Sequence, residues 1–229
     1  MTKANFSRPG KELIDSLANL PTTNISDALD RLQIRGGCEG IVPLMPTCKL
    51  CGPAFTVRYI PVKAGTAAVG DYIDEAKEGD VIVIDNGGRT YCTVWGDLLT
   101  LVAVRNKLAG TVIDGVCRDV DHIRELNYPM FTRGFFMVTG KDRVQMAEAN
   151  GPVTISNVQI HPGDIVIGDG SGVVIVPQGR AEEVLAAAKE VARAEEAIEG
   201  EIAKGSTLIE ARQRFRYHEL QRPSVKQED

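Results

Sequence analysis

The stretch YCTVWGDLLTLVAVRNKLAGTVIDGVCRDVD, residues 91–121, joins two polar corners through an apolar segment. In the first corner Gly96 and Asp97 precede leucines and valines at helical spacing, which predicts a helix from near Asp97 to Gly110. The β-branched run 111–113 predicts a buried strand, and 114–115 (Asp-Gly) predicts a turn directly after it. Arg118 and Asp119 then follow at the second corner, just beyond this rigid support.

The chemistry of these corners suits a small 2-oxo acid. The first turn of a helix carries free backbone N–H groups and partial positive charge, so the amides of residues 96–99 can hold a carboxylate close to Gly96. Arg118 can form two parallel hydrogen bonds to the same carboxylate. Asp119 is a hard oxygen ligand for Mg²⁺ or Mn²⁺, and such a cation would polarise the ketone.

Each corner also has a purely structural interpretation. A Gly-Asp pair before an apolar run is typical of a helix N-cap. An Arg-Asp pair after a strand is typical of a surface ion pair that contributes little stability. Pattern alone leaves both interpretations open.

Two motifs, WGDLL (95–99) and DGVCRDVD (114–121), carry a family resemblance. They resemble the family that contains the class II pyruvate aldolases acting on 4-hydroxy-4-methyl-2-oxoglutarate and 4-carboxy-4-hydroxy-2-oxoadipate, together with the regulator of RNase E activity A. Further matching segments extend the resemblance over residues 20–180: NISDALDRL (24–32), GPAFTVR (52–58), GDVIVIDNGG (79–88) and PGDIVIGDGSGVVIVP (162–177).

The resemblance implies a role for each site residue. It makes Trp95, Gly96, Asp97 and Leu98 lining residues of the substrate site, Arg118 the substrate-binding cation and Asp119 the metal ligand. In the regulator branch an amide residue stands where this chain has Asp119, so the metal-dependent branch is favoured. The implied fold is an α/β swivelling β/β/α-type domain, similar to a phosphohistidine domain, with a C-terminal helical extension.

The expected reaction is a carbon–carbon lyase reaction of the kind used in the degradation of aromatic compounds. Retro-aldol cleavage of a 4-hydroxy-2-oxo acid to pyruvate needs an electron sink, either a lysine Schiff base or a metal. Since no lysine stands out in an apolar motif, Mg²⁺ or Mn²⁺ at Asp119 is expected, with Arg118 neutralising negative charge. A water oriented by Asp97 or by a helix acid would take the hydroxyl proton. Oxaloacetate decarboxylation is the expected side activity.

Two other classes of function remain alternatives. One is a non-catalytic, protein-binding regulator resembling the RNase E regulator. The other is a methyltransferase, for which a glycine loop between a strand and a helix would be needed. The sequence GDGSG (168–172) instead precedes a second β-branched run, which indicates a hairpin.

Composition and charge indicate an ordinary globular protein. The 229 residues are 43% hydrophobic and 25% charged, and the net charge of −5 gives no electrostatic reason to expect nucleic acid. We expect no membrane association and a cytoplasmic location, because no run approaches the roughly eighteen apolar residues that span a bilayer and the N-terminal segment lacks a signal-peptide core. One domain over 1–229 is expected, with its core at about 20–178 and oligomerisation helices at about 179–222.

The cysteines and histidines give no independent site. Five cysteines without an export signal favour reduced thiols, and the CxxC at Cys48 and Cys51 lacks the further ligands that zinc requires. We assign no catalytic role to the histidines, although His122 lies near Arg118 in sequence.

The C-terminal part of the sequence is predicted to be helical. Residues 181–203 predict a long amphipathic helix ended by Gly205, and 208–222 predict a second helix with exposed aromatic residues. Such a helix is expected to pack on a neighbouring subunit, in line with the homotrimers or homohexamers of the family. The resemblance further suggests that an acid of this region, Glu195 or Glu196, reaches an adjacent subunit's site; a solvated helix face is the alternative.

Overall fold

The computed structural model describes residues 6–63, 67, 69–215 and 217. Its main sheet has eight strands in the order β1-β5-β4-β3-β2-β9-β10, with β6 also paired to β2. Strands β2, β3, β4 and β5 run parallel, whereas β1, β6, β9 and β10 join antiparallel. The strands are β1 Val42–Pro43, β2 Leu50–Pro61, β3 Val81–Thr93, β4 Gly110–Cys117, β5 Met130–Phe135, β6 Val144–Ala149, β9 Ile165–Asp169 and β10 Gly172–Val176; β7 Val153–Ile155 and β8 Val158–Ile160 form a separate ribbon.

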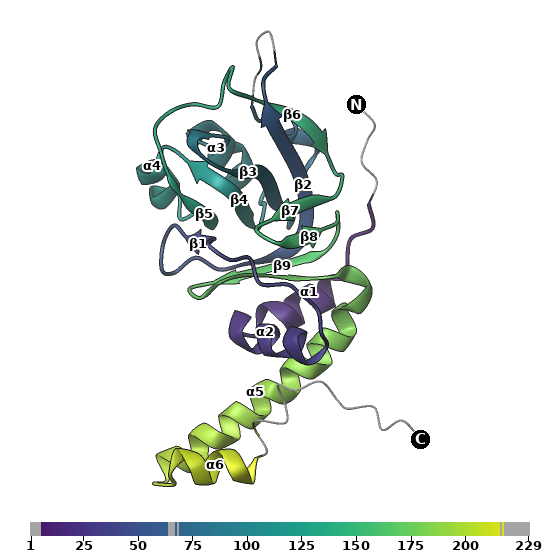
Figure 1. The fold of residues 1–229 in the computed structure, drawn as a ribbon, viewed down its shortest axis with the longest axis vertical. Coiled ribbons are helices and arrows are strands. Elements are labelled where there is room, and N and C mark those ends of the chain that lie inside the picture. Colours follow the sequence, from purple (N-terminus) through teal and green to yellow (C-terminus); the bar gives the residue numbers. More distant parts are fainter. Residues whose placement is uncertain (1–5, 64–66, 68, 216, 218–229) are drawn as a thin grey trace.

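Helices occupy two regions of the molecule (Figure 1). The crossover helices α3 and α4 connect β3 to β4 and β4 to β5, and they lie beside the parallel strands. Helices α1, α2 and α5 gather at the other end, where they pack on β9 and β10 through a buried aliphatic cluster. The helices are α1 Lys11–Ala18, α2 Thr22–Arg31, α3 Asp97–Arg105, α4 Val120–Glu125, α5 Ala181–Ala203 and α6 Leu208–Arg214, with 3₁₀ turns at Ile73–Glu75 and Gln178–Arg180.

This mixed α/β architecture with a C-terminal helical extension is the one predicted. The GDGSG segment forms the predicted hairpin between β9 and β10, and α5 spans the predicted residues 181–203. Figure 1 shows α5 projecting away from the sheets, with α6 folded back along it. The predicted second helix ends at Arg214, and most of the predicted range 216–222 lies outside the described residues. Among the described residues, no helix has the length and apolarity needed to cross a bilayer.

Two boundaries in the central stretch differ from the prediction. Helix α3 ends at Arg105 rather than at Gly110, because Lys107 adopts a left-handed conformation (φ 53°). The amide of Leu108 donates to Ala103 O (2.9 Å) and that of Lys107 to Val104 O (3.0 Å), which is the Schellman pattern of helix termination.

The predicted turn at Asp114-Gly115 is wrong. Strand β4 continues through both residues to Cys117, with a shift of register against β3 and β5. The chain turns at Arg118 and Asp119 instead, directly before α4.

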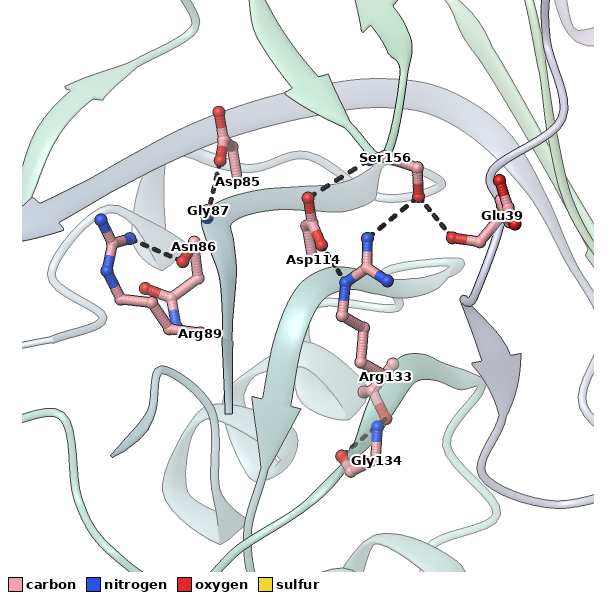
Figure 2. Close-up of polar contacts among 10 residues, drawn as sticks. Glu39, Asp85, Asn86, Gly87, Arg89, Asp114, Arg133, Gly134 and Ser156 are labelled. Carbon is pink, nitrogen blue, oxygen red and sulfur yellow. Dashed lines mark hydrogen bonds and ion pairs between the residues drawn. The ribbon is translucent and has the colours of Figure 1, made fainter. Parts of the chain in front are cut away.

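A polar cluster explains why an acid is tolerated inside the sheet (Figure 2). Asp114 forms an ion pair with Arg133 on β5, and its second oxygen accepts from the amide of Ser156 (3.2 Å) in the β7–β8 turn. Arg133 also donates to Ser156 Oγ (3.1 Å), which donates in turn to Glu39 O (2.5 Å). The cluster therefore ties two strands of the main sheet to the ribbon and to the loop before β1.

Candidate active site

The two corners of the central stretch meet in space. Because β3 and β4 are parallel neighbours, the segments leaving their carboxyl ends emerge side by side. The amide of Arg118 donates to Trp95 O (3.0 Å), which joins the corners through the backbone. The residues predicted from WGDLL and from the Arg-Asp motif are thus brought together.

Asp119 lies at the centre of this junction. Its Oδ2 accepts from the amide of Asp97 (3.1 Å) and lies 3.2 Å from Nε of Arg118. The side chains of Arg118 and Asp119 are 39% and 35% exposed, so both remain accessible to a ligand. Asp119 holds φ 56° and ψ 39°, a left-handed conformation that costs about 1–2 kcal/mol for a residue with a side chain. Such local strain is common at functional sites, and here it aims the carboxylate at the first turn of α3.

Gly96 permits the close contact between the corners. A Cβ at this position would lie 2.5 Å from Asp119 Oδ2 and 3.2 Å from Arg118 Nε. The backbone of Gly96 is extended (φ −154°), so it is the space and not the conformation that demands glycine.

We expect Gly96→Ala to displace the Asp119 carboxylate while leaving the fold intact. The added methyl group overlaps a partly exposed side chain that can rotate away, so the free energy of unfolding should change by no more than about 1–2 kcal/mol. The affinity for a divalent cation, measured by calorimetry in the presence of pyruvate, should fall at least about tenfold. Unchanged cation affinity would contradict this role of Gly96.

A cavity of about 110 Å³ opens between the corners, large enough for a compound of the size of pyruvate. The predicted residues Trp95, Gly96, Asp97, Leu98 and Arg118 line this cavity. Asp119 lies next to the lining because its carboxylate accepts from the amide of Asp97. Leu99 of the WGDLL motif also lines the cavity, and three residues that the sequence did not indicate complete the lining: Val69, Thr93 and Thr139. Thr139 arrives through a parallel bridge to Thr93, a long-range pairing with no local sequence signal.

Trp95 and Leu98 differ in their surroundings. Trp95 is 2% exposed; its indole stacks on Tyr128 (centroids 6.0 Å apart) and donates to Thr100 Oγ1 (2.9 Å). Thr100 Oγ1 donates in turn to Gly96 O (2.9 Å), so the indole braces the turn that carries the cavity. Leu98 is 72% exposed at the rim.

The amides of the first turn of α3 donate to carboxylates, whereas their predicted contact with a substrate carboxylate stays a prediction. The anions in this structure are the chain's own carboxylates: Asp119 accepts from the Asp97 amide, and Asp97 Oδ1 accepts from the Leu98 amide (2.7 Å). A substrate carboxylate would share or replace these contacts.

The residues present fit a weakly held Mg²⁺ or Mn²⁺. Within the described residues, no group of three or more His, Cys, Asp or Glu side chains is placed to hold a metal ion. Mg²⁺, however, commonly takes one or two carboxylates and completes its shell with water and substrate oxygens. The accessible Asp119 carboxylate beside a small cavity meets that requirement, and the CxxC cysteines are buried or half-buried in other parts of the fold.

Glu195 is engaged within its own chain. Its carboxylate accepts from the side-chain amide (Nδ2) of Asn24 on α2 (2.5 Å) and from the hydroxyl of Tyr217 (2.8 Å). Glu196 is exposed. Figure 1 shows α5 at the opposite end of the molecule from α3 and α4. Neither acid therefore lines the cavity of its own chain.

His122 stays without an assigned role. It lies in α4 and its Nε2 is buried, with no hydrogen-bond partner among the described residues.

The chain is similar to several known proteins. Protein DlpA of Legionella pneumophila is 45% identical over 210 residues, which is 90% of this chain and 34% of DlpA, so the chain spans about a third of that relative. A Halalkalibacterium halodurans protein, provisionally named 4-hydroxy-4-methyl-2-oxoglutarate aldolase, is 36% identical over 87% of this chain and 93% of its own length. The crystal structure of Streptomyces coelicolor RraAS2, described as an unusual member of the RNase ES inhibitor RraA protein family, superposes with a TM-score of 0.78 at 30% identity, covering 84% of this chain and 98% of RraAS2. The Aldolase/RraA family model matches residues 22–175. The chain therefore belongs to the RraA-like family, Aldolase/RraA.

Proposed function

We propose that this protein is a divalent-metal-dependent lyase that cleaves a 4-hydroxy-2-oxo acid to pyruvate and a second carbonyl compound. The observation that carries the proposal is the junction of Arg118, Asp119 and the first turn of α3 around one small cavity. The provisional names of several relatives, which denote aldolases acting on 4-hydroxy-4-methyl-2-oxoglutarate, support the same reaction class.

The proposed roles follow from charge and position. Arg118 holds the substrate carboxylate with its planar guanidinium, and the amides of residues 97 and 98 supply the positive end of the α3 dipole. Asp119 would hold Mg²⁺ or Mn²⁺. When bound, such a cation supplies Lewis acidity that stabilises negative charge on the 2-oxo oxygen.

The bond changes then require one base and one acid. The 4-hydroxyl proton leaves to a water hydrogen-bonded to Asp97 as the bond between C3 and C4 breaks, and C4 becomes a carbonyl carbon. The electron pair of that bond remains on the pyruvate half, where Arg118 offsets the charge. Protonation of C3 by water gives pyruvate. The same charge stabilisation would permit loss of CO₂ from oxaloacetate.

The experiment is an assay of pyruvate release from a panel of 4-hydroxy-2-oxo acids, run with added Mg²⁺ and after treatment with EDTA. We expect release with Mg²⁺ and a loss of at least about 100-fold in kcat after chelation, restored by readdition of the cation. If no member of the panel released pyruvate, the proposal would be wrong, and a protein-binding regulator would be the better-supported function.

We further propose that the active assembly is a homotrimer or homohexamer in the cytoplasm. Exposed apolar side chains support self-association: Leu98, Leu101 and Val104 lie on α3, and Met137, in the segment after β5, is 74% exposed. A second copy covering this surface would also shield the cavity from water.

A further inference from the structure

The peptide unit that joins Gly96 to Asp97 is hydrogen-bonded on both sides. Its carbonyl oxygen, Gly96 O, accepts from the hydroxyl of Thr100 (2.9 Å) and from the amide of Thr100 (3.1 Å). Its N–H, which belongs to Asp97, donates to Asp119 Oδ2 (3.1 Å). Because a peptide unit is planar, whatever fixes the carbonyl also fixes the direction of the N–H. Thr100 therefore sets the amide that contacts the Asp119 carboxylate.

The Thr100 hydroxyl is itself held by a buried donor. The indole Nε1 of Trp95 donates to Thr100 Oγ1 (2.9 Å), and both side chains are buried. The four groups form one hydrogen-bond relay: the indole N–H, the Thr100 hydroxyl, the Gly96–Asp97 peptide and the Asp119 carboxylate. Consecutive hydrogen bonds polarise one another, so donation to Gly96 O strengthens the Asp97 N–H as a donor.

The start of the relay has a rigid support. The indole of Trp95 stacks on Tyr128 with the ring planes 6° apart. The Tyr128 hydroxyl is hydrogen-bonded to Thr111 Oγ1 (2.9 Å) in β4, the strand that leads to Arg118. The amide of Arg118 donates to Trp95 O. The indole is thus fixed to the strand and to the corner that carry the site.

The stability of α3 does not account for this arrangement. A threonine hydroxyl that bonds the carbonyl four residues earlier usually destabilises a helix slightly. The usual device for fixing a first turn is a Ser, Thr, Asp or Asn at the N-cap, but the N-cap of α3 is Gly96. A side chain is excluded there, because a Cβ would lie 2.5 Å from Asp119 Oδ2. The Thr100 hydroxyl fixes the turn from inside the helix and leaves the space at Gly96 open.

We propose that Thr100 is a positioning residue, which aims the Asp97 amide at the Asp119 carboxylate and so holds that carboxylate in the orientation that binds the cation. Thr100 is fully buried, so it acts through the peptide unit and not by touching the substrate. This inference rests on the proposed function, because it takes Asp119 to be the cation ligand. The relay itself is testable in protein without metal or substrate.

Three variants separate positioning from stability. Thr100→Val removes the hydroxyl at nearly constant shape, and Thr100→Ser restores it. Thr111→Val is the matched control, because it removes the other buried hydroxyl of this group and leaves the Gly96–Asp97 peptide untouched. Both valine variants lose one buried hydrogen bond, so both should unfold at a temperature lower by about 2–8 °C.

The first measurement uses metal-free protein. Hydrogen exchange of the Asp97 amide, followed by NMR, should accelerate at least about tenfold in Thr100→Val and stay within about twofold of wild type in Thr100→Ser and Thr111→Val. Trp95 is the single tryptophan of the chain, so its fluorescence reports on the relay. Its emission should move to shorter wavelengths in Thr100→Val alone, because a hydrogen bond to the indole N–H stabilises the excited state.

The second measurement concerns the site. Calorimetric titration without substrate should show Mn²⁺ bound about tenfold more weakly by Thr100→Val, and kcat for pyruvate release should fall about 10–100-fold. Thr100→Ser and Thr111→Val should stay within about threefold of wild type in both quantities. Trp95→Phe removes the indole donor and keeps an aromatic ring on Tyr128, so it is a second variant that should accelerate Asp97 exchange.

Three results would overturn the inference: unchanged Asp97 exchange in Thr100→Val, a loss of Mn²⁺ affinity in Thr111→Val equal to that in Thr100→Val, or no recovery in Thr100→Ser. The second would indicate a general effect of lower stability. Failure of the proposed function looks different, because wild-type protein would then release no pyruvate although Asp97 exchange still depended on Thr100.

Discussion

Asp119→Asn should lower kcat/KM for pyruvate release by at least about a thousandfold, with no comparable change in the thermal unfolding temperature. The substitution removes the charge that would hold the cation, and a loss of about 4 kcal/mol of transition-state stabilisation corresponds to that factor. Asparagine also adopts the left-handed conformation found at position 119, so the corner should keep its shape. The measurement is steady-state kinetics on the best substrate of the panel, together with calorimetric titration of Mn²⁺.

Asp121→Asn is the matched control for this prediction. Its side chain is 92% exposed, two residues from Asp119, and its contact with Arg124 is long at 3.5 Å. It should leave kcat/KM and Mn²⁺ affinity within about twofold of wild type, since a solvent-exposed ion pair contributes little. Asp119→Asn with near wild-type turnover would rule out a cation at this residue.

Asp114→Ala should lower the free energy of unfolding by about 2–4 kcal/mol. The Asp114 side chain is 8% exposed, and its removal leaves Arg133 without its charge partner and the Ser156 amide without its acceptor. Breaking a fully buried pair costs about 3–5 kcal/mol; the lower range allows for water at Arg133, which is 27% exposed. Urea denaturation followed by circular dichroism measures the change.

The double variant Asp114→Leu/Arg133→Met distinguishes charge burial from loss of packing. Removing both charges should recover at least half of the stability lost by Asp114→Ala, because no unpaired charge remains. Asp15→Ala, which breaks the exposed Lys11–Asp15 pair, is the surface control and should cost less than about 1 kcal/mol. A double variant less stable than Asp114→Ala would mean that the hydrogen bonds to Ser156 matter more than the charge.

Local sequence patterns correctly predicted the helices and hairpins that are determined by neighbouring residues in the chain. The spacing of apolar residues over 181–203 identified α5, and the glycine-rich segment between two β-branched runs identified the β9–β10 hairpin. The junction of the two corners was also predictable, because consecutive parallel strands place the segments that follow them at one edge.

The errors arise where distant contacts override a local preference. Asp-Gly usually turns a chain, but Asp114 stays in β4 because Arg133, nineteen residues later, supplies its charge partner. Helix α3 ends at Arg105 because Lys107, two residues later, adopts a left-handed conformation, and lysine is not a residue that usually marks a helix end. Thr139 lines the cavity through its bridge to Thr93, and no local pattern of residues marks this long-range pairing.

The turn at residues 139–143 lies outside the two βα corners that carry Arg118 and Asp119. Its backbone is held by contacts to Thr93 and Ala67 that do not involve its own exposed side chains at 141 and 143. Replacing those side chains should therefore leave the backbone of the turn, and the cavity wall formed by Thr93 and Thr139, in place. Substitutions at these two positions would then change the charge of this surface without disturbing the corners that carry Arg118 and Asp119.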